Sequence, residues 1–217
     1  MLVIFDCDGV LVDSEWVGNC FIAEHLTAAG YPTRPEEAIR EFMGTAGRSF
    51  EEAVERWIGE PFPPSLAKAR LKRGLQFIDS GIAEVSGACA FIRSLPDDFP
   101  IAVASSAVSR WLNAHLDHLG LSERFGGHVY SGREHVERVK PAPDIYLFAA
   151  DALGVAIGDC LIVEDSVIGI EGAVASGAEV VGLLAGSHIR DGHGQRLLDA
   201  GAHRCVASFD ELAALYF

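Results

Sequence analysis

Short apolar runs that alternate with helical patterns constrain the fold of this chain more than any other feature of its sequence. The runs have the length of buried strands in a parallel sheet, and helical periodicity separates the later ones. The runs are Leu2–Phe5, Ile101–Ala104, His128–Tyr130, Leu161–Val163 and Val180–Leu184, and the helical stretches are Arg110–Leu119, Asp144–Leu153 and Val167–Ser176. This alternation predicts an α/β fold with a doubly wound, Rossmann-like parallel sheet, to which the weaker run Arg204–Val206 adds an edge strand.

The segment between the first two apolar runs follows a different pattern, with helical periodicity and no convincing strand. The helices expected there are Glu15–Ala29, Pro35–Met43, Phe50–Ile58 and Ser65–Ile78. A stretch of about 65 residues is too long for a connecting loop inside a compact domain. We therefore expect two domains, an α/β core formed by residues 1–14 and 82–217 and an inserted, all-helical cap formed by residues 15–81.

The net charge of the chain argues against a nucleic-acid partner. The chain has 17 basic and 31 acidic side chains, which give a formal net charge of −14, whereas a nucleic-acid binder usually shows a basic field or stripe. A small anionic substrate is compatible with this charge, because physiological salt screens exposed charges over about 8 Å. We expect a small-molecule substrate and no nucleic-acid partner.

No sequence feature indicates a membrane or an export route. The chain has no apolar run of roughly 18 or more residues, and the N-terminus enters an apolar run at once, without the basic region of a signal peptide. The five cysteines are odd in number and none are spaced as C-x-x-C, as expected of reduced thiols. We expect a cytoplasmic protein without a membrane partner, a monomer or a weak homo-oligomer.

The first apolar run ends in two carboxylates, Asp6 and Asp8. Side chains two residues apart on an extended chain point to the same face, so both should project from the carboxyl end of a central strand, where ligands bind in open α/β sheets. Two carboxylates this close repel each other, and a hard cation or a shared proton relieves the repulsion. Because Asp and Gly are also common in turns, this stretch alone does not decide between a site and a turn.

Three further segments carry polar residues beside apolar runs. Ser105 and Ser106 stand before a helical stretch, where a hydroxyl suits phosphate binding or an ordinary helix cap. Lys140 precedes a proline and is pushed toward an extended conformation, although most lysines are merely solvated. Glu164 and Asp165 abut an apolar run, where buried acids are costly without a cation. Together these residues predict an anion and metal site at one edge of the sheet.

The segment from Asp6 to Ser14, with the sequence DCDGVLVDS, resembles the first motif of the haloacid dehalogenase superfamily. Ser105 matches the second motif, Lys140 the third, and Glu164-Asp165 the acidic fourth motif. The inserted helical segment and the spacings also agree with this family. Within it, the chain resembles the subgroup that contains β-phosphoglucomutase, phosphoglycolate phosphatase and 6-phosphogluconate phosphatase.

The resemblance implies roles for the acidic residues. Asp6 would be the nucleophile that forms an aspartyl phosphate, and Asp8 the acid that protonates the leaving alcohol and then the base that activates water. Mg²⁺ would be held by Asp6, Asp165 and the backbone carbonyl of Asp8, with Glu164 acting through a metal-bound water or behind the ligands.

The resemblance also implies how phosphate and substrate are recognised. Ser105, Ser106 and Lys140 would bind the phosphoryl oxygens. The loop 44–48 resembles the substrate-specificity loop of the subgroup, in which Arg48 beside Gly44 would hold a distal anionic group; a capping loop with a solvated arginine is the alternative. His188 and His193 flank a glycine-rich loop that would border the site, and we assign them no metal-binding role.

These residues favour a magnesium-dependent phosphatase that acts on a small metabolite such as a sugar phosphate, phosphogluconate or phosphoglycolate. Asp8 argues against a dehalogenase, which lacks this acid. Gly18 stands where the β-phosphoglucomutases carry a histidine, which favours hydrolysis over the alternative, a sugar-phosphate mutase. A signalling receiver domain is disfavoured by the order of the residues, and an inactive binding protein of the same fold by the presence of all of them.

Overall fold

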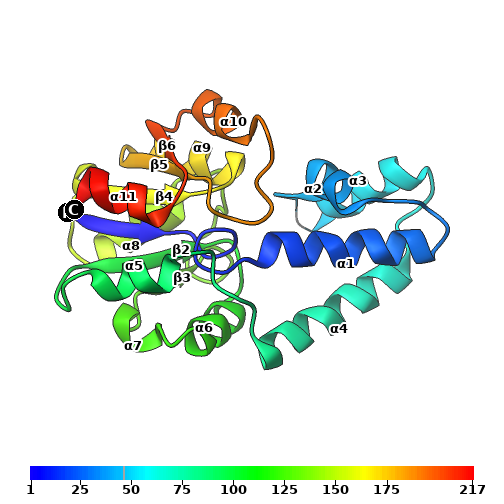
Figure 1. Ribbon diagram of the computed structural model, residues 1–217, viewed down its shortest axis with the longest axis horizontal. Coiled ribbons are helices and arrows are strands. Elements are labelled where there is room, and N and C mark those ends of the chain that lie inside the picture. The colour runs from blue at the N-terminus through cyan, green and yellow to red at the C-terminus, as the bar shows by residue number, and fades with distance from the viewer. Residues whose placement is uncertain (46) are drawn as a thin grey trace. The chain divides into compact units, whose positions relative to one another are not determined.

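A parallel β-sheet organises the larger of the two compact units into which the chain divides (Figure 1). The computed structural model describes residues 1–45 and 47–217. The larger unit consists of Met1–Asp13 and Gly81–Phe217, and the smaller of Ser14–Ser80. Within the described residues the sheet has six strands in the order β3-β2-β1-β4-β5-β6. The strands are β1 (Leu2–Phe5), β2 (Ile101–Ser105), β3 (Val129–Ser131), β4 (Cys160–Glu164), β5 (Glu179–Leu183) and β6 (Arg204–Val206). The predicted doubly wound α/β fold is confirmed.

The central strand β1 lies between β2 and β4, and both pairings are parallel. Phe5, the last residue of β1, is opposite Val103 of β2 and Val163 of β4. The chain builds the sheet outward from β1 through β2 to β3, and then returns to add β4 on the other side of β1. Ligands bind at such a switch point, beyond the carboxyl ends of the strands. The residues that follow β1 and β4 therefore emerge side by side.

Helices cover both faces of the sheet, because alternate strand residues point to opposite sides. The Phe5 ring packs on one face against Phe91 and Phe125, whereas Ile4 belongs to the buried cluster of the other face together with Ile145. The helical segments of this unit are α5 (Ala88–Ser94), α6 (Ser109–His118), α7 (Ser122–Phe125), α8 (Asp144–Ala152), the 3-10 turn η1 (Ile157–Asp159), α9 (Val167–Ser176), α10 (His193–Asp199) and α11 (Phe209–Tyr216).

The smaller unit contains the helices predicted between the first two apolar runs. They are α1 (Ser14–Ala28), α2 (Pro35–Phe42), α3 (Arg48–Ile58) and α4 (Pro64–Ser80). Helix α3 begins two residues before the predicted Phe50, at Arg48, whose guanidinium pairs with Glu51 and Glu52 of the next turn. The helices share a hydrophobic core of their own, whose largest members are Ile22, Leu26, Phe42, Phe50, Val54 and Leu66.

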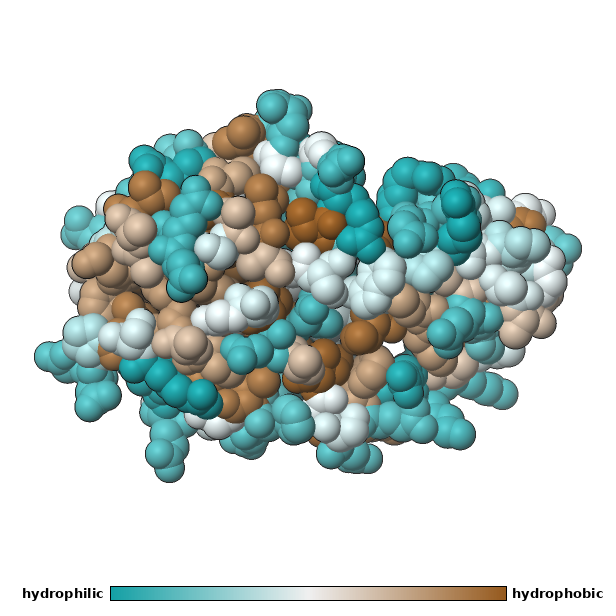
Figure 2. All heavy atoms as spheres, in the orientation of Figure 1, coloured by the Kyte–Doolittle hydropathy of each residue, from teal (hydrophilic) through white to brown (hydrophobic). Residues whose placement is uncertain are grey.

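The surface carries many polar side chains. On the face drawn in Figure 2, hydrophilic residues are spread over both units, as the content of charged residues leads one to expect. The helices in the described part of the chain all lack the combination of length and apolar character that a membrane crossing requires.

Candidate active site

Three carboxyl groups meet where β1 and β4 end. Asp6 follows β1, Glu164 is the last residue of β4, and Asp165 comes next. Because Phe5 and Val163 are partners in the two parallel strands, the acids that follow them leave the sheet at the same level. One oxygen of each acid lies within 4.8 Å of an oxygen of the others, and all three residues are buried. The structure thus brings these sequence-predicted acids together.

Lys140 provides the positive charge of this cluster. Its ammonium donates to Asp6 Oδ1 and to Glu164 Oε1, each at 2.7 Å, and the side chain is buried. Tyr146 of α8 supports the pair, since its hydroxyl donates to Glu164 Oε1 at 2.9 Å and its ring centroid lies 4.8 Å from the ammonium. Buried charges of this kind are tolerated only when opposite charges and hydrogen bonds surround them.

The other oxygen of the Glu164 carboxylate is bound by the start of α9. Oε2 accepts hydrogen bonds from the backbone N–H of Asp165 at 2.9 Å, and from the N–H and the hydroxyl of Ser166 at 3.0 Å each. The Ser166 oxygen in turn accepts from the N–H of Gly169 and caps the helix. Glu164 therefore has protein partners on both oxygens and acts as a fixed anchor for Lys140.

Burial and neighbouring charges set the pKa values of the cluster. Burial opposes the charged form of Lys140, but Asp6 and Glu164 raise its pKa well above the usual range. Burial likewise opposes the Glu164 carboxylate, yet Lys140 and the hydrogen bonds hold its pKa below the ordinary value. For Asp6 and Asp165, burial and the neighbouring carboxyl groups outweigh Lys140 and raise both pKa values. One lysine thus stabilises one carboxylate, and the ionised forms of the other two acids lack a compensating charge.

The excess of acid fits a divalent cation. Carboxylate and carbonyl oxygens are the ligands that hard cations take in proteins, and a dication would stabilise the ionised forms that burial disfavours at Asp6 and Asp165. Among the residues that the structure describes, Asp6, Glu164 and Asp165 form the cluster whose side chains can hold such an ion.

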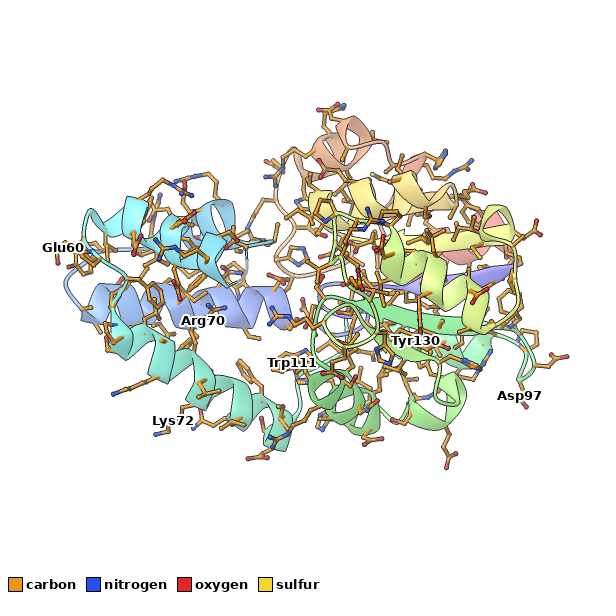
Figure 3. The ribbon with its side chains drawn as sticks, turned by 180° about the vertical axis from the view of Figure 1, so that it is seen from behind. Glu60, Arg70, Lys72, Asp97, Trp111 and Tyr130 are labelled. Atoms are coloured by element: carbon orange, nitrogen blue, oxygen red, sulfur yellow. The ribbon has the colours of Figure 1, made fainter. Side chains whose placement is uncertain are left out.

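Asp8, the second acid of the first motif, has a different partner. Its Oδ1 accepts a hydrogen bond from the indole N–H of Trp111 at 3.0 Å, and its side chain is half-buried. Trp111 comes from α6, in the same unit as Asp8 (Figure 3). The next residue, Gly9, adopts a φ of 81°, and a Cβ at this position would collide with the Asp165 carboxyl group. The glycine therefore lets the loop of the first motif approach Asp165 closely.

The two predicted phosphate-binding serines follow the neighbouring strand. Ser105 is the last residue of β2 and is buried, and its hydroxyl oxygen accepts from the N–H of Ala107 at 3.2 Å. Ser106 is exposed, and its carbonyl oxygen accepts from the Arg133 side chain at 3.0 Å. Both serines belong to the carboxyl edge of the sheet, one strand away from Asp6.

Two histidines of the glycine-rich loop after β5 contact Asp165. His188 is buried and its Nε2 lies 2.9 Å from Asp165 Oδ2, and His193 Nε2 lies 2.6 Å from the Asp165 carbonyl oxygen. Arg196 donates to His193 Nδ1 at 2.9 Å. Because arginine has no acceptor, Nδ1 carries no proton, so His193 is the neutral tautomer that donates to Asp165 from Nε2. Burial also lowers the pKa of His193.

The predicted specificity residues Arg48 and Gly44 belong to the smaller unit. Arg48 is exposed and its guanidinium lies 3.2 Å from Glu51, 3.1 Å from Glu52 and 3.5 Å from Glu55, all on its own helix. Gly44 adopts a φ of 75°. Ala46, in the same predicted loop, lies outside the described residues.

Sequence reasoning missed the roles of Trp111 and Tyr146, whereas it placed His188 and His193 beside the site without naming their partner, Asp165. The signal for the two histidines was their place in a glycine-rich loop after a strand, because such loops border ligand sites at the carboxyl edge of a sheet. Trp111 and Tyr146 lie on helices whose patterns gave no hint of a partner, since their contacts join distant parts of the chain.

Together, the fold and the site define a class: α/β proteins that bind a ligand at the carboxyl edge of a parallel sheet, here at an acidic centre paired with a lysine. Residues 1–177 match the haloacid dehalogenase-like hydrolase family, and the chain belongs to this family. It is therefore an enzyme, a hydrolase.

Individual relatives agree with this assignment. The chain is 27% identical to the 6-phosphogluconate phosphatase of Escherichia coli (strain K12) over 187 aligned residues. These residues cover 86% of this chain and 83% of the relative. A solved haloacid dehalogenase-like protein of Agrobacterium tumefaciens str. C58 is 36% identical, with a TM-score of 0.90 over 99% of this chain and 96% of that chain. A family hydrolase of Deinococcus radiodurans R1, solved with bound phosphate and sodium, is 31% identical, with a TM-score of 0.85 over 99% and 94% of the two chains.

Proposed function

We propose that this hydrolase is a Mg²⁺-dependent phosphatase that cleaves small phosphorylated metabolites through an aspartyl phosphate. The observation that carries the proposal is the convergence of Asp6, Glu164, Asp165 and Lys140 at the carboxyl ends of β1 and β4. Hydrolysis of phosphate monoesters needs dense compensation of negative charge, because the reaction is among the slowest to proceed unaided.

In the proposed reaction, Asp6 attacks phosphorus and forms the acyl phosphate while the bond to the leaving oxygen breaks. Asp8 gives its proton to that oxygen, so that the alcohol leaves in neutral form. Asp8 then accepts a proton from the water that attacks the acyl phosphate, which releases inorganic phosphate and regenerates Asp6. Lys140, in contact with Asp6, neutralises the phosphoryl oxygens, and Ser105 and Ser106 donate hydrogen bonds to them.

Asp6, Asp165 and the backbone carbonyl of Asp8 would hold Mg²⁺, with Glu164 behind them. When bound, the ion shields the negative charge that Asp6 and the phosphoryl group bring together. The contacts of Glu164 support its indirect role, because both of its oxygens already accept hydrogen bonds from the protein.

The substrate proposed is a sugar phosphate or a phosphorylated sugar acid. The support is the name of the Escherichia coli relative and the phosphate bound in the Deinococcus radiodurans structure. We also propose that the helical insertion, residues 15–81, is a cap that selects the substrate, with Arg48 and Gly44 as its specificity residues. Arg48 would have to exchange carboxylates of its own helix for a substrate anion.

The proposal is tested by a phosphate-release screen over phosphorylated metabolites, with Mg²⁺ and with a chelator. We expect Mg²⁺-dependent turnover of at least one sugar phosphate and none by the variant Asp6→Asn. Substantial activity in that variant would show that Asp6 is not the nucleophile. Appearance of an isomerised sugar phosphate without free phosphate would instead identify a mutase.

A further inference from the structure

We propose that Trp111 is a positioning residue that orients the Asp8 carboxyl group for proton transfer. The inference rests on the proposed function, in which Asp8 is the acid and then the base. It starts from the hydrogen bond of 3.0 Å that the indole N–H donates to Asp8 Oδ1.

The chemistry of the indole assigns different tasks to the two carboxyl oxygens. Indole Nε1–H is a donor only, so Oδ1 of Asp8 accepts this hydrogen bond both in the carboxylate and in the carboxylic acid. The proton that moves to the leaving oxygen, and later comes from water, then belongs on Oδ2. The indole N–H thus restrains the rotation of the carboxyl group, which matters because small misplacements of a catalytic group cost much of its rate advantage.

Trp111 is itself held by its own helix. One turn further along α6, the buried ring of His115 stacks on it, with 4.1 Å between ring centroids and 37° between planes. His115 Nδ1 lies 2.9 Å from the Trp111 carbonyl oxygen, and because a carbonyl only accepts, Nδ1 is the donor. The indole is therefore a packed support, as a residue that orients a catalytic group should be.

Burial alone does not explain the contact. Trp111 is only half-buried, and half-buried indoles commonly reach water with the N–H. The Trp111 N–H instead donates to the acid two residues after the proposed nucleophile, 103 positions away along the chain. Trp57 offers a comparison, since its N–H donates at 2.9 Å to the Thr33 hydroxyl, within the smaller unit.

The first test compares two substrates that differ in their need for an acid. p-Nitrophenyl phosphate has a good leaving group, whereas an alkyl phosphate from the release screen needs protonation. We expect Trp111→Phe to lower kcat/KM about tenfold or more for the alkyl phosphate, since a general acid contributes roughly 100-fold to 10,000-fold, and to change it less than about threefold for the aryl phosphate. Trp111→Gln, which keeps a donor of similar reach, should recover much of the lost kcat/KM for the alkyl phosphate. Trp57→Phe should have the kcat/KM of the wild type for both substrates.

Equal losses on both substrates, or no loss, would overturn the positioning role while the wild type still releases phosphate. Absence of turnover by the wild type with Mg²⁺ would overturn the proposed function and this role with it.

A second test does not depend on activity. The chain has three tryptophans, so its proton–nitrogen correlation spectrum contains few indole signals, and Trp111→Phe identifies that of Trp111. Asp8→Ala should shift this signal to lower proton frequency, because a carboxylate acceptor deshields the indole proton, and should leave the Trp57 signal in place. An unmoved Trp111 signal would overturn the contact, and with it the inference.

Discussion

Asp6 is a buried acid whose ionised form is opposed by burial and by the neighbouring acids Glu164, Asp165 and Asp8, and Lys140 offsets this only in part. The folded chain therefore binds a proton at Asp6 at pH values where the unfolded chain has lost it. Because the folded state binds more protons, stability falls as the pH rises above the ordinary pKa of an aspartic acid, about 3.9. A bound dication would reverse this loss by favouring the carboxylate.

Replacement of Asp6 by Asn removes the charge and keeps the shape. In a buffer with chelator, we expect Asp6→Asn to have a higher Tm than the wild type near neutral pH. The difference should shrink as the pH falls through about 4, because the wild-type carboxyl group then becomes protonated in the unfolded state as well. Mg²⁺ should raise the Tm of the wild type more than that of the variant. Thermal unfolding followed by circular dichroism at several pH values measures both effects.

The exposed Asp97 supplies the control, because Asp97→Asn should leave the Tm nearly unchanged at every pH. A lower Tm of Asp6→Asn than of the wild type at neutral pH, without metal, would contradict the account of the cluster.

The Tyr146 hydroxyl supports the same cluster, because it donates to the buried Glu164 carboxylate. Tyr146→Phe keeps the ring and removes this hydrogen bond, so we expect a loss of about 1.5–3 kcal/mol in the free energy of unfolding, the range for bonds to charged groups. Tyr130→Phe is the control, since its hydroxyl lies 3.0 Å from His128 Nδ1, with no carboxylate partner among the described residues, and its loss should stay near 1 kcal/mol. Urea unfolding of both variants tests whether Tyr146→Phe loses more free energy of unfolding than Tyr130→Phe.

At the scale of secondary structure, the site depends on how α9 follows β4. Glu164 ends the strand, Ser166 caps the helix, and Gly169 lies against the Glu164 carboxyl group in the first turn. A side chain on Gly169 would collide with that carboxyl group, which Lys140 and Tyr146 hold in place. Helix α9 therefore has a glycine at position 169, despite its poor helix propensity, because the Glu164 carboxyl group occupies the space of a side chain.

Gly169→Ala separates these two effects. Helix propensity alone predicts a gain of about 1 kcal/mol, but the collision should reverse the sign and cost about 1–3 kcal/mol, as overpacking does. Gly74→Ala in α4 is the matched control, because a Cβ there meets no atom within 4 Å and propensity should prevail. Denaturant unfolding measures both changes, and a stabilised Gly169→Ala variant would show that the carboxyl group can move away.

The strands were predictable because buried parallel strands are nearly continuous apolar runs. Leu2–Phe5 was predicted with its observed bounds, whereas the predicted His128–Tyr130 lies one residue before the observed Val129–Ser131. The differences occur at strand ends, where polar residues such as Ser105 and Glu164 continue the ladder although their side chains belong to the site. The hydrophobic pattern of the sequence does not show that these polar residues still belong to the strands.

The convergence of Asp6, Lys140, Glu164 and Asp165 was also predictable, because topology brings the carboxyl ends of neighbouring parallel strands together. The side chains that support them were not. Tyr146, Trp111 and His193 reach the site from α8, α6 and α10, and such contacts depend on helix rotation and packing, which one sequence does not determine. The catalytic and binding roles remain predictions for the experiments above.

At the scale of the whole molecule, the sheet unit and the helical unit each have buried apolar residues of their own. The buried clusters of the sheet unit and of the helical unit contain different residues. The ends of the sheet unit's two segments lie next to each other, since the Asp13 N–H donates to the Ala83 carbonyl at 2.9 Å and Val12 bridges to Glu84. The helical unit is thus inserted where the chain leaves the sheet unit and returns to the same place.

This arrangement predicts that residues 14–80 can be replaced by a short glycine–serine linker without loss of the sheet unit. The acidic cluster and Lys140 lie entirely in that unit, so the shortened protein should unfold cooperatively and gain Tm with Mg²⁺. If the insertion is the substrate-selecting cap, the shortened protein should still cleave p-nitrophenyl phosphate and discriminate less among phosphorylated metabolites than the full chain. If the shortened protein discriminated among phosphorylated metabolites as the full chain does, the sheet unit would determine specificity. If it unfolded without cooperativity, the sheet unit would depend on the helical unit for its stability.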